Sequence, residues 1–133
     1  MEELINEIRR RLNIIKSYSK NYMESLDKKE YGKASEMLWG IINNLASILS
    51  ILNGGKPISK HSELREFIES LAYILKDEEI IDLFRSCEIL HANYFHNFLD
   101  EILFESYRKD AEKLINKLQE LIIRELQAKG IKI

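Results

Sequence analysis

The chain has 133 residues, of which 45% are hydrophobic and 32% are charged, and its formal net charge is −2. This length and apolar content suit one folded domain, residues 1–133, and exclude a disordered chain. A charge so close to zero excludes a uniformly basic, nucleic-acid-binding surface, so any phosphate-binding site must be a local patch.

Cysteine usage and the N-terminal residues bear on the compartment. Cys87 is the only cysteine, so no internal disulfide can form, and a reducing, cytoplasmic location is expected. Charged residues recur every few positions from Met1 to Leu12, which argues against a signal peptide or a membrane span. No uncharged apolar run approaches the roughly 20 residues that cross a bilayer, so no membrane association is expected.

The predicted elements are all helices. The sequence contains no Val and no Thr, which strands favour, so a sheet is not expected. Apolar residues recur at helical spacing in five segments that Gly, Pro and short polar stretches separate. In chain order these segments are about residues 2–26, 31–52, 62–76, a fourth that begins at 77 and ends between 97 and 100, and 100–128. The short connections between them predict an all-α, antiparallel bundle of about five helices.

Capping residues mark the predicted helix ends. Gly54 or Gly55 can take the left-handed conformation that ends the second helix. Ser59 or Ser62 is expected to cap the third helix, and Asp77 the fourth. The fourth helix carries the candidate site.

That helix contains the stretch LFRSCEILHANYFHNFLDE, residues 83–101. At about 100° per residue, one face is apolar apart from a single histidine. Its members are Ile80, Phe84, Cys87, His91, Tyr94, Phe95 and Phe98. The opposite face carries Asp82, Arg85, Ser86, Asn93 and His96. His91 is therefore either a core residue or a group that faces a groove or a dimer seam, and His96 either faces solvent or joins a site.

Metal and cofactor sites are not predicted. His91 and His96 are five residues apart, whereas paired metal ligands on one helix usually lie about four apart. Cys87 has no cationic partner on its face other than His91, so a buried, inert thiol is expected. The arginines of residues 9–11 have acidic neighbours one turn away, which favours ion pairs over a phosphate-binding patch.

Two blocks of the sequence resemble a known family. EYGKASEMLWGIINNLASILSILNGGKPISKHSEL, residues 30–64, and LFRSCEILHANYFHNFL, residues 83–99, are similar to the archaeal PaREP family, which is usually placed in the HEPN superfamily of helical bundles. The features that carry the resemblance are KASEMLWG, a Gly-Lys-Pro turn that leads to KHSEL, and the aromatic stretch after Arg85. The resemblance extends over about residues 30–107 and implies a HEPN-like bundle.

The resemblance also implies a site. Many HEPN proteins carry an arginine, a short spacer and a histidine, often with a polar residue after the arginine, and Arg85, Ser86 and His91 fit this pattern with a spacer of five residues. The pattern implies a homodimer whose two motifs line one cleft and, in active members, metal-independent RNA cleavage. His91 would then transfer the proton of the 2′-hydroxyl, Arg85 would stabilise the charged phosphorane, and Ser86 or Asn93 would orient the imidazole ring. Other members are inactive, bind nucleotides, act as antitoxins or accompany minimal nucleotidyltransferases.

Helix geometry conflicts with this pairing. In an unbroken helix Arg85 and His91 lie about 9 Å apart along the axis and roughly 120° apart around it. Either the helix breaks near His91, or a dimer completes the site, or Arg85 works with His96, or no site exists. We therefore expect a HEPN-like protein, dimeric and without a cofactor, that binds nucleic acid, nucleotide or a nucleotidyltransferase-type protein partner. The alternative is a metal-independent endoribonuclease with an Arg-x5-His motif.

Overall fold

Five helices account for most of the chain. The computed structural model describes residues 1–133 and contains α1 (Glu2–Asp27), α2 (Tyr31–Leu52), α3 (His61–Leu75), α4 (Glu79–His96) and α5 (Glu101–Ala128), with no strand. The all-α prediction is confirmed; every helix begins within two residues of its predicted position, and α4 ends at His96, just before its predicted end between residues 97 and 100. Long, regular apolar periodicity is the strongest local signal for a helix, which explains this agreement.

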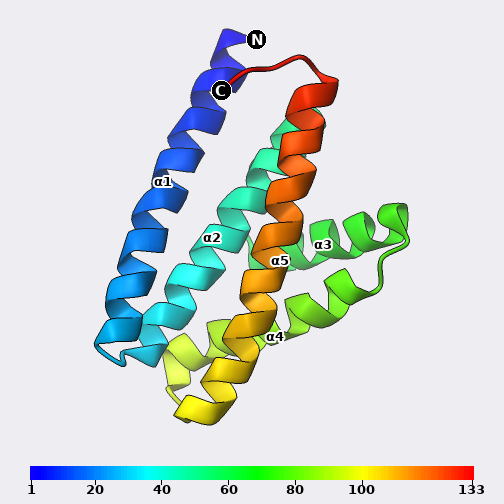
Figure 1. The fold of residues 1–133 in the computed structure, drawn as a ribbon. Coiled ribbons are helices and arrows are strands. Elements are labelled where there is room, and N and C mark those ends of the chain that lie inside the picture. Colours follow the sequence, from blue (N-terminus) through cyan, green and yellow to red (C-terminus); the bar gives the residue numbers. More distant parts are fainter.

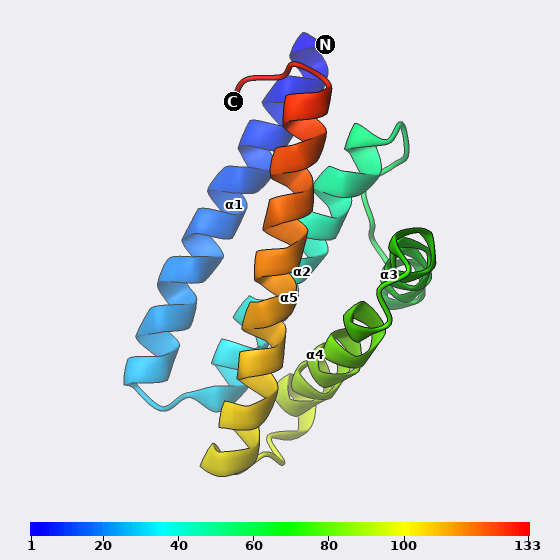
Figure 2. The same ribbon diagram turned by 45° about the vertical axis from the view of Figure 1, so that its right-hand side comes forward.

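The helices form a group of three with a hairpin across one side. The long helices α1, α2 and α5 lie side by side, and the α3–α4 hairpin lies across them (Figures 1 and 2). Helix α2 is central and contacts all four others, whereas α1 packs mainly against α2. Neighbours along the chain run antiparallel in α1–α2 and α4–α5, while α2 and α5 run in the same direction (Figure 1).

One buried core includes side chains from all five helices. It contains 28 buried hydrophobic residues, and α2 contributes the largest share, with Leu38, Ile42, Leu45 and Ile48 almost fully buried. By length and composition alone α2 could cross a membrane, but 61% of its apolar window is buried inside this bundle. Its central place in the core accounts for its composition.

Helices α1 and α2 approach each other closely at Gly40. A Cβ atom at this position would lie 2.9 Å from a ring carbon of Tyr18, a distance that real side chains do not tolerate. The absence of a side chain at Gly40 therefore lets the Tyr18 ring of α1 lie against the backbone of α2.

The helix ends depart from prediction at α3 and α4 and agree at the end of α2. The N-cap of α4 is Glu78 and not Asp77, although the Asp77 side chain accepts the backbone N–H of Glu79 at 3.2 Å. Gly54 takes the left-handed conformation that was predicted for the end of α2, with φ of +83°. Neither Ser59 nor Ser62 is the N-cap of α3; Lys60 is, and the Ser59 hydroxyl donates to the Glu63 side chain instead. That carboxylate also accepts the Lys60 backbone N–H, so the Glu63 side chain satisfies the backbone donor of the N-cap residue, as in a capping box.

Candidate functional site

The buried face of α4 is rotated relative to the predicted one. Its buried residues are Ile80, Leu83, Phe84, Ser86, Cys87, Leu90 and Asn93. Ser86 and Asn93, which the wheel placed on the polar face, are therefore buried, and Tyr94, Phe95 and Phe98, which it placed on the apolar face, are exposed. The reason is that α4 lies between α2, α3 and α5, whereas a helical wheel assumes a single apolar neighbour.

Ser86 and Asn93 bind polar groups on neighbouring elements. The Ser86 hydroxyl donates to Asp110 Oδ2 of α5 at 2.6 Å. The Asn93 amide donates to Ser35 Oγ of α2 at 3.3 Å, and Asn93 Oδ1 accepts the backbone N–H of Leu99 at 2.9 Å. The Asn93 bonds hold the corner where α4 turns into α5, the Ser86 bond joins the middle of α4 to α5, and neither side chain contacts His91 through these bonds.

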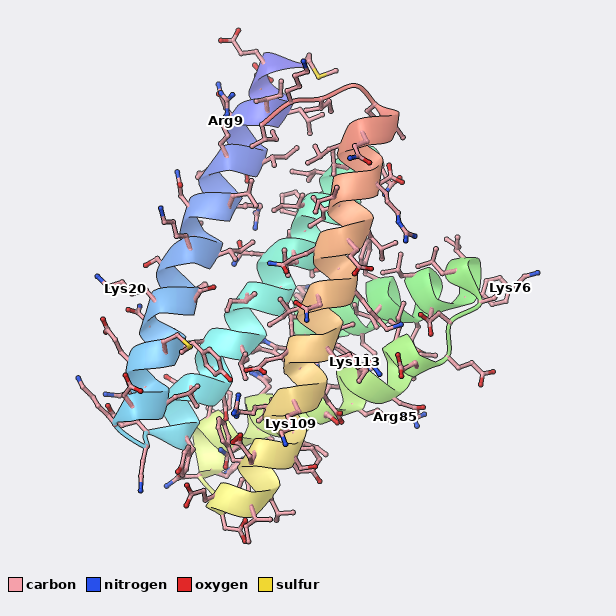
Figure 3. All side chains as sticks on the ribbon, viewed as in Figure 1. Arg9, Lys20, Lys76, Arg85, Lys109 and Lys113 are labelled. Carbon is pink, nitrogen blue, oxygen red and sulfur yellow. The ribbon has the colours of Figure 1, made fainter.

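Arg85 lies away from His91. Its side chain is 71% exposed and its one ion pair is with Asp82, at 3.3 Å on the same helix. Figure 3 shows Arg85 projecting outward from α4. Because α4 is continuous from Glu79 to His96, the two members of the predicted motif point in different directions within one chain. His96, in the last turn of α4, is exposed and has no hydrogen-bond partner in the structure.

His91 lies in a shallow site formed with α2. Its side chain is 22% exposed, and its ring stacks on the indole of Trp39 with centroids 4.1 Å apart and planes at 14°. His91 Nδ1 lies 3.6 Å from Glu36 Oε2. Both of these atoms are buried, and neither has a hydrogen-bond partner. Two polar atoms of this kind are costly to bury, so the pair is a feature that packing alone does not explain.

A second histidine comes from α3. The ring of His61 lies 5.4 Å from that of His91, at 89°, and 4.9 Å from Trp39. His61 Nε2 lies 2.8 Å from Glu88 Oε2, which also accepts a hydrogen bond from the Arg65 guanidinium at 2.9 Å. We call this cluster the histidine site; its members are Glu36, Trp39, His61, Arg65, Glu88 and His91.

The environment shifts two members of the histidine site toward their neutral forms. Burial lowers the pKa of His91, the nearby His61 lowers it further, and Glu88 opposes both effects. Burial also raises the pKa of Glu36. His91 is therefore a neutral imidazole at neutral pH, with a free ring nitrogen that can accept a proton.

The whole histidine site lies inside the region that matches a known family. A protein-family model described as the archaeal PaREP1/PaREP8 family matches residues 10–115. The chain belongs to this family. No curated protein and no solved structure matches it. In this member of the PaREP family, the match extends beyond residues 30–107, where the sequence blocks placed it, into both α1 and α5.

The sequence predicted His91 but not its partners. Glu36, His61 and Glu88 lie on three different helices, and His61 is 30 positions from His91. Local spacing cannot reveal such a cluster, although KASEMLWG and KHSEL, two of the stretches on which the resemblance to the family rested, contain Glu36, Trp39 and His61. No group of three or more His, Cys, Asp or Glu side chains in residues 1–133 is arranged to hold a metal ion.

An exposed apolar surface adjoins the histidine site at the corner between α4 and α5. We call it the apolar tip; its members are Tyr94, Phe95, Phe98, Ile102 and Leu103. Phe95 is 65% exposed and Ile102 is 81% exposed, and Phe95 also contacts the His91 ring edge-on at 5.3 Å. A hollow of about 490 Å³ beside the tip is lined by Tyr94 and by charges of both signs, among them Lys29, Lys33, Asp100 and Glu101.

Proposed function

We propose that this PaREP family member is a HEPN-like module that binds single-stranded RNA at the histidine site with the help of Phe95, and that it forms a homodimer through the other residues of the apolar tip. One observation carries the proposal: the exposed ring of Phe95 belongs to the apolar tip and also touches His91. The surface best suited to an apolar contact is therefore continuous with the site that holds two imidazoles.

Stacking and local charge support single-stranded RNA as the ligand. Unpaired bases stack on exposed aromatic rings, and Phe95 offers such a ring beside the histidine site. Arg65, which is 54% exposed, and His61 supply the donors that a phosphate needs. With a net charge of −2 the protein has few spare cations, so stacking rather than phosphate contact should provide most of the affinity.

Charge complementarity supports a second copy of the chain as the partner of the apolar tip. Large apolar side chains left in water favour association. The hollow beside them carries Lys29 and Lys33 together with Asp100 and Glu101. A two-fold interface pairs each patch with the same patch on the other copy. On a surface with charges of both signs, the positive groups of one copy can therefore pair with the negative groups of the other.

Light scattering on the purified protein tests the dimer. We expect the wild type and Ile123→Glu to be dimers and Ile102→Glu to be a monomer, because Ile102 lies in the apolar tip and Ile123 is an exposed isoleucine elsewhere on α5. A wild type that stays monomeric at all concentrations would remove the homodimer. The apolar tip would then be left for a different protein, such as a nucleotidyltransferase.

Fluorescence anisotropy with a labelled RNA oligonucleotide tests binding. Loss of one base–aromatic stack costs about 1–3 kcal/mol, so Phe95→Ala should bind about 10-fold more weakly than the wild type. Tyr73→Ala is the matched control, because Tyr73 is an exposed aromatic residue of α3 outside both the site and the tip. Equal affinities for the wild type and Phe95→Ala would contradict the proposal.

The second candidate function is metal-independent RNA cleavage at the same site. The observation that favours it is that Glu36 lies at Nδ1 of His91, which leaves Nε2 as the ring nitrogen free to face a substrate. We expect the wild type to cleave RNA in the presence of a chelator and His91→Ala to have lost this activity. Equal rates for the two proteins would remove this candidate and leave RNA binding in place.

A further inference from the structure

We propose that His61 is a second catalytic residue, which acts as the general acid opposite His91, and that the substrate is an RNA phosphodiester with a free 2′-hydroxyl. This inference rests on the proposed RNA cleavage at the histidine site. It adds a proton donor that comes from α3 and lies outside the Arg-x5-His pattern.

The first argument is the spacing of the two imidazoles, which share a contact with the Trp39 ring. His61 and His91 come from α3 and α4, their centroids are 5.4 Å apart, and both rings contact Trp39. In phosphodiester cleavage by a neighbouring hydroxyl, the attacking and leaving oxygens lie on opposite sides of one phosphorus atom. The two proton-transfer groups must therefore both reach one phosphate group, which the neighbouring rings of His61 and His91 are close enough to do.

The second argument is that each imidazole has its own carboxylate. Glu36 Oε2 lies 3.6 Å from Nδ1 of His91, and Glu88 Oε2 lies 2.8 Å from Nε2 of His61. A carboxylate that is hydrogen-bonded to one ring nitrogen orients the ring, as Glu88 does for His61, whereas Glu36 lies beside Nδ1 of His91 without a hydrogen bond. The opposite nitrogens, Nε2 of His91 and Nδ1 of His61, are then the ones that can meet a substrate.

The third argument is that the two rings differ in environment. His91 is 22% exposed, and its neighbour Glu36 makes no hydrogen bond to it. His61 is more exposed, and its Nε2 forms a hydrogen bond with Glu88. A pair of titratable groups whose surroundings differ in this way can supply both a base and an acid. Arg65, bound to the same Glu88, places a fixed positive charge beside the phosphate.

The reaction balances with these groups alone. His91 Nε2 takes the proton of the 2′-hydroxyl as the O2′–P bond forms, the P–O5′ bond breaks, and His61 Nδ1–H gives its proton to O5′. The products are a 2′,3′-cyclic phosphate and a 5′-hydroxyl, and proton exchange with water restores both rings. The substrate brings its own nucleophile, which suits a site whose nearest thiol, Cys87, is buried and bonded to the backbone carbonyl of Leu83.

Leaving-group dependence tests the inference on the full-length protein with a chelator present. On an RNA oligonucleotide, His61→Gln and His91→Gln should each lose at least about 100-fold in rate, while His96→Gln should match the wild type. On uridine 3′-(4-nitrophenyl phosphate), whose leaving group needs no proton, His61→Gln should recover most of the wild-type rate and His91→Gln should not. This recovery also shows that His61→Gln is folded.

The pH profile and a binding assay separate the outcomes. The bell-shaped rate profile of the wild type should lose its alkaline limb in His61→Gln and its acidic limb in His91→Gln. If His91→Gln is inactive and His61→Gln cleaves RNA normally, the role of His61 is wrong and cleavage stands. If the wild type binds a 2′-deoxy-substituted oligonucleotide but cleaves no RNA, the acid–base pair is wrong and RNA binding stands. If the wild type neither binds nor cleaves, the inference and the proposed function fail together.

Discussion

The buried polar groups of α4 fall into two sets, one hydrogen-bonded and one without hydrogen bonds. On the side toward the α4–α5 corner, Ser86 and Asn93 are buried and their side chains are hydrogen-bonded to Asp110, Ser35 and the Leu99 backbone. At the histidine site, the buried atoms of His91 of α4 and Glu36 of α2 lie next to each other without a hydrogen bond. The comparison separates polar residues that stabilise the fold from polar residues that are available for chemistry.

The largest effect is expected from Asn93→Ala. The substitution leaves the buried Leu99 N–H without its acceptor and removes the bond to Ser35. It should lower the free energy of unfolding by about 2–4 kcal/mol, as measured by urea denaturation. Asn116→Ala is the control, because Asn116 is exposed in the middle of α5 and Ala is the better helix former, so this variant should be no less stable than the wild type.

If the free energy of unfolding of Asn93→Ala falls by less than about 1 kcal/mol, the corner does not depend on its buried hydrogen bonds, and the contrast with the histidine site is wrong. Circular dichroism should show that both variants keep their helix content. The histidine site should also keep its RNA affinity in Asn93→Ala, because Asn93 contacts none of its members through a hydrogen bond.

An intermediate, pH-dependent effect is expected from Glu36→Gln. Burial raises the pKa of Glu36 in the folded protein, so its contribution to stability is present below the pKa of the unfolded chain and is lost as the pH rises through the folded value. Glutamine keeps the shape without the charge. Glu36→Gln should therefore gain stability relative to the wild type as the pH rises from 4 to about 8.

Thermal unfolding across that pH range measures the difference, and Glu66→Gln, which removes an exposed carboxylate of α3, serves as the control. A difference in stability between Glu36→Gln and the wild type that stays constant at all pH values would show that ionisation of Glu36 does not destabilise the fold. If His91 needs this carboxylate for catalysis, the same variant should cleave RNA more slowly than the wild type. More stability together with less activity is the combination expected at a functional site.

The sequence predicts the fold of this chain better than its site. The helices were located correctly because their apolar periodicity is local and long, and because the chain lacks Val and Thr. The burial of Ser86 and Asn93 was missed because their partners, Asp110 and Ser35, are 24 and 58 positions away. A wheel for one helix contains no information about such partners.

The same limit applies to the histidine site. His91 was selected from its place on α4 and from a family pattern, but the pattern joined it to Arg85, which points elsewhere. The residues that do meet His91 come from α2 and α3. Only the crossing of the α3–α4 hairpin over α2 brings them together, and that crossing is a property of the tertiary fold (Figure 2).

The smallest effect is expected from Arg85→Ala. Arg85 and its partner Asp82 are both exposed, and exposed ion pairs contribute little, so the free energy of unfolding should change by less than about 0.5 kcal/mol. RNA affinity and cleavage should also match the wild type, because the histidine site contains Arg65 and not Arg85. Lys109→Ala, another exposed cation of this side of the molecule (Figure 3), is the control.

A loss of 10-fold or more in Arg85→Ala alone would show that the guanidinium reaches a histidine site after all, and within one chain the direction of α4 forbids this. The arginine would then have to act on the other protomer. Mixed dimers of Arg85→Ala and His91→Ala would decide the point, because in one of their two sites both wild-type residues would meet. Recovered cleavage in the mixture would place Arg85 in the shared cleft that the HEPN resemblance implies. Continued inactivity would show that Arg85→Ala loses activity for a reason other than a missing contact across the dimer.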